Sequence, residues 1–355
     1  MNRRVLYIFT GIILLISLGN KPGQSPYAFP GLLFFPKMPI DKSNPVTKEG
    51  ALLGRYLFYD SSLSSDSSFS CGSCHKQEYA FSDSPNRFSS GRTGEKMLRN
   101  TPALYNLAWY PTLFWDGRAS SIENQISFPL HAVNEMDIDW TRAINRIKQN
   151  SAYNHLFENA FDSHEIDSTK IIKAIGQFVR TLLSYQSKYD SAIIKNAHFT
   201  RDEYAGFIII ADQTKGDCMH CHPTDGNSLM TTTRFSNNGL DAIDDLNNYS
   251  DKGLGAITGN PKQNGWFKIP SLRNVALTAP YMHDGRFATL EEVMNFYSDS
   301  VHNVLNIDPK MELATRHGAN LTATEKRQVI AFLKTMTDSA FITNSEFSNP
   351  FLPKK

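Results

Sequence analysis

The sequence predicts a mainly α-helical protein of two domains with loop-rich connections, and three observations support this fold class. At about 150 residues per domain, a chain of 355 residues suggests two domains. Three Thr-x-x-Glu capping boxes, at Thr200, Thr289 and Thr322, mark the starts of segments with apolar residues at helical spacing. The pentapeptide Cys-x-x-Cys-His occurs twice, from Cys71 and again from Cys218, so each domain receives one copy. We therefore place the boundary between residues 197 and 198.

The first 19 residues have the pattern of a secretory signal peptide. Arg3 and Arg4 precede an apolar run from Val5 to Leu18, and small residues around Leu18 form an acceptable cleavage site. The run is shorter than the about 20 residues of a comfortable transmembrane helix, although an uncleaved N-terminal anchor is the alternative. In either case we expect residues 20–355 in the periplasm, with no membrane span after the signal.

Apolar periodicity predicts three helices before the first capping box, at residues 47–59, 140–160 and 168–185. The first of these has one apolar face, made of Leu52, Leu53, Tyr56 and Leu57. Residues 225–265 are rich in Asn, Asp and Gly and are expected to form a loop with a short hairpin. The prediction is therefore a helical framework with long polar connections.

The charge balance argues against one large class of partners. The chain carries 36 Lys and Arg against 35 Asp and Glu, a formal charge of +1. Proteins that bind DNA or RNA neutralise phosphates with a basic excess, and this chain has none. We therefore expect no nucleic-acid partner.

The four cysteines point to covalent haem rather than to disulfides. An exported protein with four cysteines would by default receive two disulfides. Here all four belong to Cys71-Gly72-Ser73-Cys74-His75 and Cys218-Met219-His220-Cys221-His222. Cys-x-x-Cys-His is the attachment motif of c-type haem, in which both thiols form thioethers and the histidine binds the iron. A redox dithiol or a zinc site built from the four cysteines would leave both adjacent histidines unexplained.

The sequence thus predicts two cytochrome c-like haem domains, with His75 and His222 as the iron ligands. The sixth ligand of each iron then decides the function. An iron with both axial positions filled by protein passes electrons, whereas an open position can bind and activate peroxide or oxygen.

Several further motifs resemble those of the bacterial di-haem cytochrome c peroxidases and their MauG-type relatives. They are Arg99-Asn100-Thr101-Pro102, Phe114-Trp115-Asp116-Gly117-Arg118, Glu135-Met136, Pro270-Ser271-Leu272-Arg273-Asn274 and Pro280-Tyr281-Met282-His283-Asp284-Gly285. The likeness runs from about Pro45 to Asp338, which is nearly the whole mature chain.

The resemblance implies that the first haem is the peroxide site, with Gln125 and Glu135 on its distal side. Glu135 would move a proton between the two peroxide oxygens, and Gln125 would orient the peroxide. Trp115 would carry electrons between the haems. A calcium ion would lie at the domain interface, on the Asn100 side chain and the carbonyls of two further residues, Thr278 and Pro280.

The sequence departs from ordinary members of that family at two positions. No histidine lies between His75 and Asn100, where peroxidases have a loop ligand, and Arg92 stands at the expected offset. The peroxide site is therefore expected to be open without reductive activation. The second departure is Tyr297, which occupies the place of the methionine ligand of the second haem, as in MauG-type proteins.

Two alternatives to Tyr297 as the distal ligand stay open. Helical spacing after Thr289 puts Met294 on the same face as Tyr297, and Met282 is a further candidate. A thioether ligand would raise the reduction potential of the haem. A phenolate would lower it, because it stabilises the ferric state.

The leading hypothesis is a periplasmic peroxidase that reduces hydrogen peroxide with electrons from a small cytochrome c or a cupredoxin. A MauG-like oxidase acting on a partner protein or an organic substrate is the alternative. Gly216 stands where MauG has a tryptophan, which weakens that reading. A plain electron-transfer cytochrome is the third possibility. Relatives are often dimers, so a homodimer is a further expectation.

Overall fold

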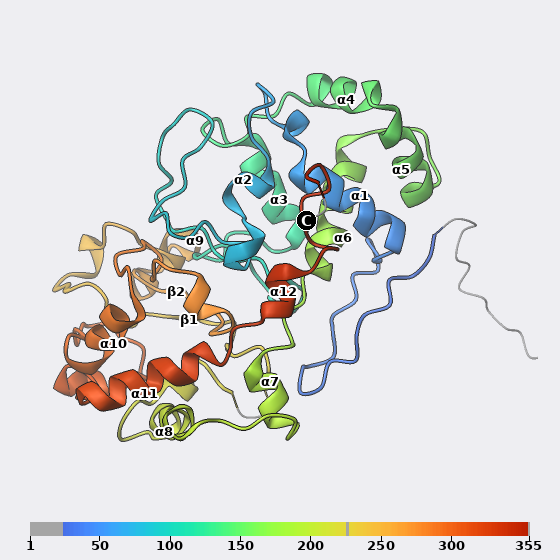
Figure 1. Ribbon diagram of the computed structural model, residues 1–355. Coiled ribbons are helices and arrows are strands. Elements are labelled where there is room, and N and C mark those ends of the chain that lie inside the picture. The colour runs from blue at the N-terminus through green and yellow to red at the C-terminus, as the bar shows by residue number, and fades with distance from the viewer. Residues whose placement is uncertain (1–23, 225–226, 354–355) are drawn as a thin grey trace, which may run out of the picture.

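The computed structural model describes residues 24–224 and 227–353, and this part of the chain is mostly helical with one two-stranded sheet (Figure 1). Its α-helices are α1 (Lys48–Tyr59), α2 (Cys71–Cys74), α3 (Ile122–His131), α4 (Trp140–Gln149), α5 (Ser151–Phe161), α6 (Ser168–Thr181), α7 (Lys188–Ile193), α8 (Arg201–Ala211), α9 (Leu254–Thr258), α10 (Leu290–Asp299), α11 (Ala323–Lys334) and α12 (Ser339–Thr343). Short 3-10 helices cover Ser61–Leu63, Gln77–Tyr79, Leu107–Trp109, Cys218–His220, Leu246–Asn248, Pro261–Gln263, Val275–Leu277 and Glu312–Arg316. The signal-peptide prediction lies outside the described residues.

The first half of the chain is built on α1, which packs along α6 and against α5. Leu53 and Leu57 of α1 are fully buried in this core. Gly54 lets the two long helices approach closely, because a Cβ there would lie 1.9 Å from the carbonyl oxygen of Ala174 on α6. The helix that leads into the first Cys-x-x-Cys-His motif is thereby held against the longest helix of its half.

The second half repeats this arrangement. Here α8, which leads into the second motif, packs along α11, and α10 contacts α11 (Figure 1). Again a glycine stands at the contact, because a Cβ on Gly206 would lie 2.0 Å from the carbonyl oxygen of Gln328. Phe332 is fully buried where α11 meets aromatic side chains of the segments around α7 and α8.

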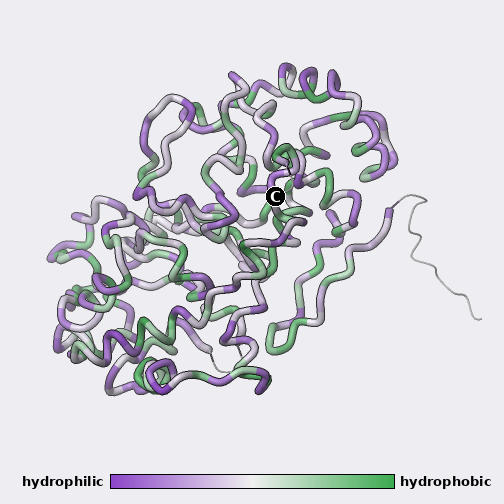
Figure 2. The backbone as a smooth tube through the Cα atoms, in the orientation of Figure 1, coloured by the Kyte–Doolittle hydropathy of each residue, from purple (hydrophilic) through white to green (hydrophobic). Residues whose placement is uncertain are grey.

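Both ends of the described chain cross between the halves. Residues 24–47 form a long extended hairpin on one side of the molecule, with a hydrophobic bend (Figures 1 and 2). In this segment the ring of Phe35 packs at a tilt against Trp109 and lies under the guanidinium of Arg273. At the other end, Phe341 and Phe347 belong to the core of the first half. The predicted domain boundary between residues 197 and 198 therefore does not describe these two terminal segments, which contact the other half of the molecule.

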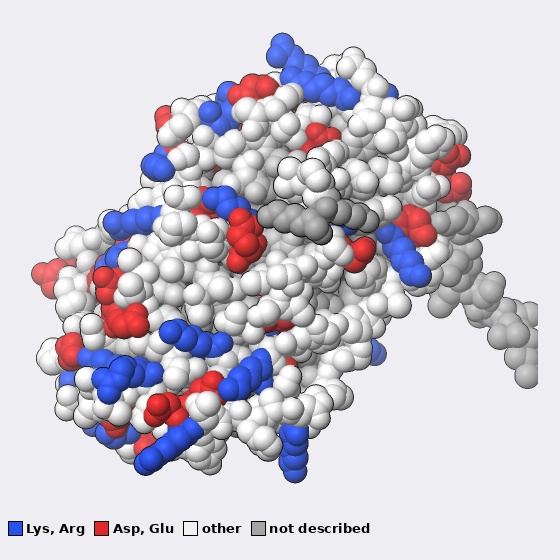
Figure 3. Space-filling view, viewed as in Figure 1, with Lys and Arg blue, Asp and Glu red and all other residues white. Residues whose placement is uncertain are grey.

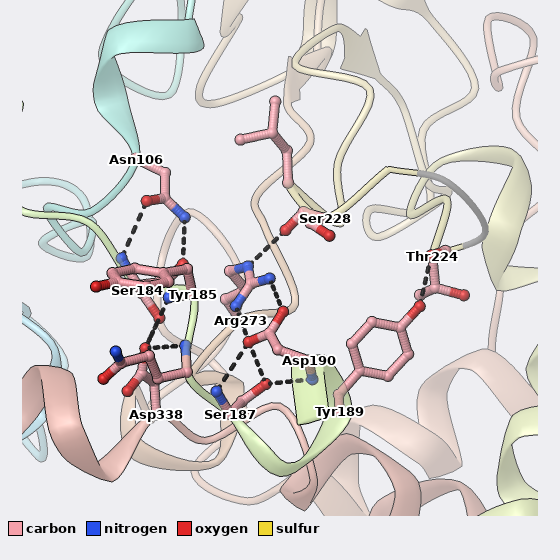
Figure 4. A network of polar contacts seen from close by, with 12 residues as sticks. Asn106, Ser184, Tyr185, Ser187, Tyr189, Asp190, Thr224, Ser228, Arg273 and Asp338 are labelled. Atoms are coloured by element: carbon pink, nitrogen blue, oxygen red, sulfur yellow. Dashed lines mark hydrogen bonds and ion pairs between the residues drawn. The ribbon is translucent and has the colours of Figure 1, made fainter. Parts of the chain in front are cut away.

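A polar network joins the halves near the N-terminal ends of α7 and α12 (Figure 4). Asn106 exchanges hydrogen bonds with the backbone of Ser184, and Asp338 accepts from the amides of Tyr185 and Gln186. Nearby, the buried Arg273 pairs with Asp190 of α7. These contacts fix the segment that leads from the first half into the second.

Three sequence predictions needed correction. The helix expected at residues 140–160 is two helices, because Asn150 ends α4 and its side chain caps α5 by accepting from the Ala152 amide. The helix expected to end at Tyr185 ends at Thr181. Leu52 is 43% exposed and does not share the buried face of Leu53 and Leu57.

The capping-box prediction is confirmed, since Thr200, Thr289 and Thr322 cap α8, α10 and α11. The short hairpin expected within residues 225–265 is not what the structure shows, because the second strand lies beyond residue 265. Strand β1 (Phe235–Ser236) pairs antiparallel with β2 (Phe267–Lys268), and α9 lies between them in the chain.

No helix within the described residues is long and apolar enough to cross a membrane. On the face shown in Figure 3, basic and acidic side chains are interspersed. This distribution agrees with the near-zero formal charge of the chain.

Candidate functional site

The first Cys-x-x-Cys-His motif forms a single helical turn. Helix α2 places Cys71 and Cys74 one turn apart, and Ser70 and Ser73 cap its start reciprocally. The backbone amide of His75 donates to the carbonyl of Cys71, which closes the turn. The turn therefore presents both thiols and the histidine in the order that haem attachment requires.

The ring of His75 is prepared to bind a metal. Its Nδ1 lies 2.7 Å from the carbonyl oxygen of Phe81. Because a carbonyl can only accept, Nδ1 carries the proton, and the lone pair of Nε2 is free to bind a metal. Burial lowers the pKa of His75 and so keeps the ring neutral, as a metal ligand must be. This hydrogen bond is the observation that fits the motif to haem iron.

A cavity of about 1110 Å³ opens beside this motif. Its lining includes Cys74, His75, Gln125, Pro129, Glu135 and Trp115. The volume slightly exceeds the roughly 300–1,000 Å³ of ordinary ligand pockets. The cavity brings together the residues that the family resemblance assigned to the peroxide site.

Glu135 and Gln125 reach the cavity from neighbouring elements. Gln125 lies on α3, and Glu135 lies on the turn between α3 and α4. Burial raises the pKa of Glu135, and the nearby Arg118 guanidinium opposes the rise. Arg118 itself lies over the ring of Phe114, 3.5 Å from its centroid. Glu135 is thus a carboxyl group poised to hold a proton at a higher pH than an exposed one.

Arg92 is held against the turn that carries Glu135. Its guanidinium pairs with Asp137 at 2.9 Å and donates to the carbonyl of Val133. The adjacent Gly91 packs so closely that a Cβ would lie 1.8 Å from the carbonyl oxygen of Asn134. Gly91 and Arg92 are therefore held tightly against the turn that carries Glu135.

Trp115 lies where the two halves meet. Its indole N–H donates to the carbonyl of Asn100, and its own carbonyl accepts from the Lys268 amide of the second half. The next residue, Asp116, accepts from Arg99 and from Arg118. The motif around Trp115 is therefore fixed by ion pairs inside the cavity lining.

The second motif is wound as a 3-10 turn from Cys218 to His220. The amide of His222 donates to the carbonyl of Cys218. Burial lowers the pKa of His222 to about 4, against the opposing effect of the carbonyls of Met230 and Pro270. Within the described residues its buried Nδ1 has no hydrogen-bond partner of normal geometry. The ring is neutral, which suits an iron ligand.

Tyr297 lies on α10 with its hydroxyl 2.9 Å from the side-chain amide of Asn238, which donates to it. The same amide lies 3.7 Å from the sulfur of Met282. Burial raises the pKa of Tyr297 to about 12. Asn238 therefore holds two of the three candidate distal ligands together, while Met294 is buried in the core of the second half. Sequence reasoning missed Asn238, because nothing local marks it.

The three residues predicted to hold calcium all line the same cavity. The side-chain amide nitrogen of Asn100 donates to the carbonyl of Arg87, so its Oδ1 is left to accept or to bind a cation. Within the described residues no three His, Cys, Asp or Glu side chains gather as a metal cluster. A cation held by Asn100, Thr278 and Pro280 would rest on neutral oxygens, as calcium accepts.

The sequence reasoning missed Lys268 in the cavity region, and it named His283 only as part of a motif, without its stacking partner. Lys268 is largely buried, and burial lowers its pKa to about 8. Its ammonium lies 4.5 Å from the centroid of the Phe235 ring and donates to Thr112. His283 stacks on Phe267 with ring centroids 3.5 Å apart. Both contacts join residues that are distant in sequence, so no local pattern announces them.

Comparison with known proteins gives a consistent set of relatives. The family model described as di-haem cytochrome c peroxidase matches residues 48–198. The methylamine utilization protein MauG of Methylorubrum extorquens is 33% identical over 301 residues, which cover 84% of this chain and 81% of that protein. The cytochrome-c peroxidase IdrP1 of a Pseudomonas species (strain SCT) is 31% identical over 99% of this chain and 97% of its own length.

Solved structures agree with these relatives. A crystal structure of a MauG-like protein associated with microbial copper homeostasis superposes with a TM-score of 0.84 at 34% identity, over 92% of this chain and 100% of that one. The diheme peroxidase BthA of Burkholderia thailandensis has a TM-score of 0.69 at 22% identity, over 88% of this chain and 90% of that one, and shows the shared fold.

Proposed function

The chain belongs to the family of di-haem cytochrome c peroxidases and MauG-type proteins and carries two c-type haems; from that premise we propose that it reduces hydrogen peroxide to water at the first haem. Electrons would come from a small cytochrome c or a cupredoxin and pass through the second haem and Trp115. Residues 20–197 and 198–355 would be the two haem domains, and residues 1–19 would direct export to the periplasm.

One observation carries the proposal: a single cavity brings Cys74 and His75 of the first motif together with Gln125 and Glu135. Thioethers at Cys71 and Cys74 and the Nε2 of His75 would hold the haem. The haem supplies the redox chemistry of the iron.

The other steps belong to side chains of this chain. The carboxylate of Glu135 takes a proton from one peroxide oxygen and returns it to the other, which then leaves as water. The side-chain amide of Gln125 donates a hydrogen bond that orients the peroxide. Arg92 is engaged with Asp137, so it does not occupy the distal space. These features support a peroxide site that is accessible before any reduction.

The test is stopped-flow absorbance of the diferric protein mixed with hydrogen peroxide. We expect a fast Soret change in the wild type, and a rate lowered by about 10²- to 10⁴-fold in Glu135→Gln, because the acid–base group is lost. Glu95→Gln is the matched control, since Glu95 is an exposed carboxyl in the loop that packs on the same turn. An unchanged rate in Glu135→Gln would remove Glu135 from the mechanism.

A MauG-type oxidase is the second candidate, favoured by the 33% identity to MauG and by Tyr297. Its tryptophan-dependent form has less support, because Gly216 stands at the tryptophan position and a Cβ there would lie 2.5 Å from the carbonyl oxygen of Ile209. Reduced cytochrome c separates the two functions. A peroxidase consumes it stoichiometrically with peroxide, whereas a donor-independent oxidase holds its oxidised state in its presence.

A further inference from the structure

The four tryptophans of the chain differ in what their indole N–H groups contact. Those of Trp109, Trp115 and Trp266 donate to backbone carbonyls, of Pro36, Asn100 and Asn306 respectively. Trp140 instead donates to the Nε2 atom of His131 at 3.2 Å. A carbonyl oxygen cannot take the indole proton, whereas an imidazole nitrogen is the side-chain base that gains and loses protons near neutrality.

The tautomer of His131 is fixed by its other nitrogen. Nδ1 lies 2.7 Å from the carbonyl oxygen of Ser127, one helical turn back on α3, and a carbonyl can only accept. The proton of the neutral ring is therefore on Nδ1, and the lone pair of Nε2 faces the indole N–H. The two rings meet edge to face, with centroids 6.0 Å apart.

This pair lies at the surface, at the end of the helix that supplies Gln125 and Pro129 to the lining of the cavity. His131 is the last residue of α3, two residues after Pro129, which lines the cavity. Its position is about 9 Å along the helix axis from Gln125 at 1.5 Å per residue. His131 is exposed, and Trp140 is half-buried, packing against the core of the first half. The indole thus connects the protein interior with solvent.

We propose that Trp140 and His131 form a surface site of proton-coupled oxidation, through which small phenolic donors in solution reduce the peroxide-oxidised first haem. The proposal rests on the function proposed above for that haem. The Trp140 indole loses one electron to the oxidised haem centre. Its Nε1–H bond breaks, and the proton moves to Nε2 of His131, which leaves a neutral indolyl radical and an imidazolium.

The phenol then completes the cycle. It gives one electron to the indolyl radical, the imidazolium returns its proton to Nε1, and the phenol releases its own proton and becomes a phenoxyl radical. Two such cycles balance one peroxide: hydrogen peroxide and two phenols give two waters and two phenoxyl radicals. Each electron that leaves Trp140 is thus replaced from solution.

The different hydrogen-bond partners of Trp115 and Trp140 give the two indoles different roles in electron transfer. An oxidised Trp115 has only a carbonyl beside its N–H, so it cannot pass its proton on and returns quickly to its reduced form. This suits a relay. An oxidised Trp140 loses its proton to His131, which traps the oxidising equivalent at the surface, where a donor can reach it.

The experiment compares the holoprotein with Trp140→Phe, His131→Gln and the control Trp109→Phe. Trp109 is also half-buried in the first half, but it donates to a carbonyl. Each protein is mixed with hydrogen peroxide without a donor, freeze-quenched and measured by electron paramagnetic resonance. Guaiacol oxidation and cytochrome c oxidation are then measured separately.

We expect a neutral tryptophanyl radical in the wild type and in Trp109→Phe, and none in Trp140→Phe. Guaiacol oxidation should fall by roughly 100-fold in His131→Gln, because the amide cannot take the proton. Cytochrome c oxidation should be unchanged in all three variants. An undiminished radical or guaiacol rate in Trp140→Phe overturns this inference alone, whereas a wild type that neither reacts with peroxide nor oxidises cytochrome c overturns the proposed function as well.

Discussion

Replacing Arg273 with methionine would break a buried ion pair that fixes the junction between the halves (Figure 4). The Arg273 side chain is fully buried and places one guanidinium nitrogen 2.8 Å from a carboxylate oxygen of Asp190. Its Nε donates to the carbonyl of Ser228. Although burial raises the pKa of Asp190, the hydrogen bonds from Arg273 hold it below its usual value.

The expected loss of unfolding free energy depends on the hydrogen bonds that Asp190 keeps in the variant. Removing one partner of a buried pair costs about 3–5 kcal/mol of unfolding free energy. Asp190 retains hydrogen bonds from the amide and hydroxyl of Ser187, so we expect the lower limit, about 3 kcal/mol. At about 2–4 °C per kcal/mol, the unfolding midpoint should fall by about 6–12 °C.

The double variant Arg273→Met with Asp190→Leu is the control. It removes both charges, so its remaining cost is mainly the lost cap at Ser187, about 1 kcal/mol. Thermal unfolding followed by far-ultraviolet circular dichroism measures both. A single variant within about 2 °C of the wild type, or a double variant that falls as far as the single one, would refute this account.

Three further predictions concern the haem sites and the calcium site. Burial raises the pKa of Glu135, and the proposed base is its carboxylate, so kcat/KM for peroxide should rise with pH along a limb that lies above the ordinary range of a glutamate. Arg118→Gln should move that limb to still higher pH, because it removes the cation that favours the carboxylate, and a limb moved to lower pH would contradict the assignment. Asn238→Ala should change the resonance Raman bands of the second haem if Tyr297 binds its iron, and an unaltered spectrum would exclude that ligand. Asn100→Ala should weaken calcium binding by at least the roughly 10-fold seen when supporting groups are lost, as measured by titration calorimetry on chelator-treated protein, and wild-type protein without a binding isotherm would exclude the site.

The sequence predicts what depends on neighbours in the chain. The capping boxes at Thr200, Thr289 and Thr322 are local hydrogen-bond patterns, and all three helices begin where expected. The single helix predicted for residues 140–160 is wrong, because Asn150 satisfies both the end of α4 and the start of α5. Leu52 was misplaced because the buried face of α1 is set by its contact with α6, which helical spacing alone does not show.

In the candidate site too, the sequence alone predicts only the residues that are close together in the chain. Cys71, Cys74 and His75 follow from spacing, whereas the proximity of Gln125 and Glu135 to them was available only from the family resemblance. Asn238 and the Trp140–His131 pair arise from contacts that no motif marks. Their roles become visible only when the donor and acceptor atoms are placed in space.

The crossing of the C-terminal segment into the first half bears on the order in which the protein matures. Phe347 fills the core behind α1, and its carbonyl accepts from the hydroxyl of Tyr59. The ring of Tyr59 in turn lies against the first motif, 2.5 Å from where a Cβ on Gly72 would be. Because a chain is synthesised from its N-terminus, Cys71 and Cys74 emerge long before Phe347 does. Haem can therefore be attached while this side of the motif is still uncovered, and the segment that carries Phe347 covers it later.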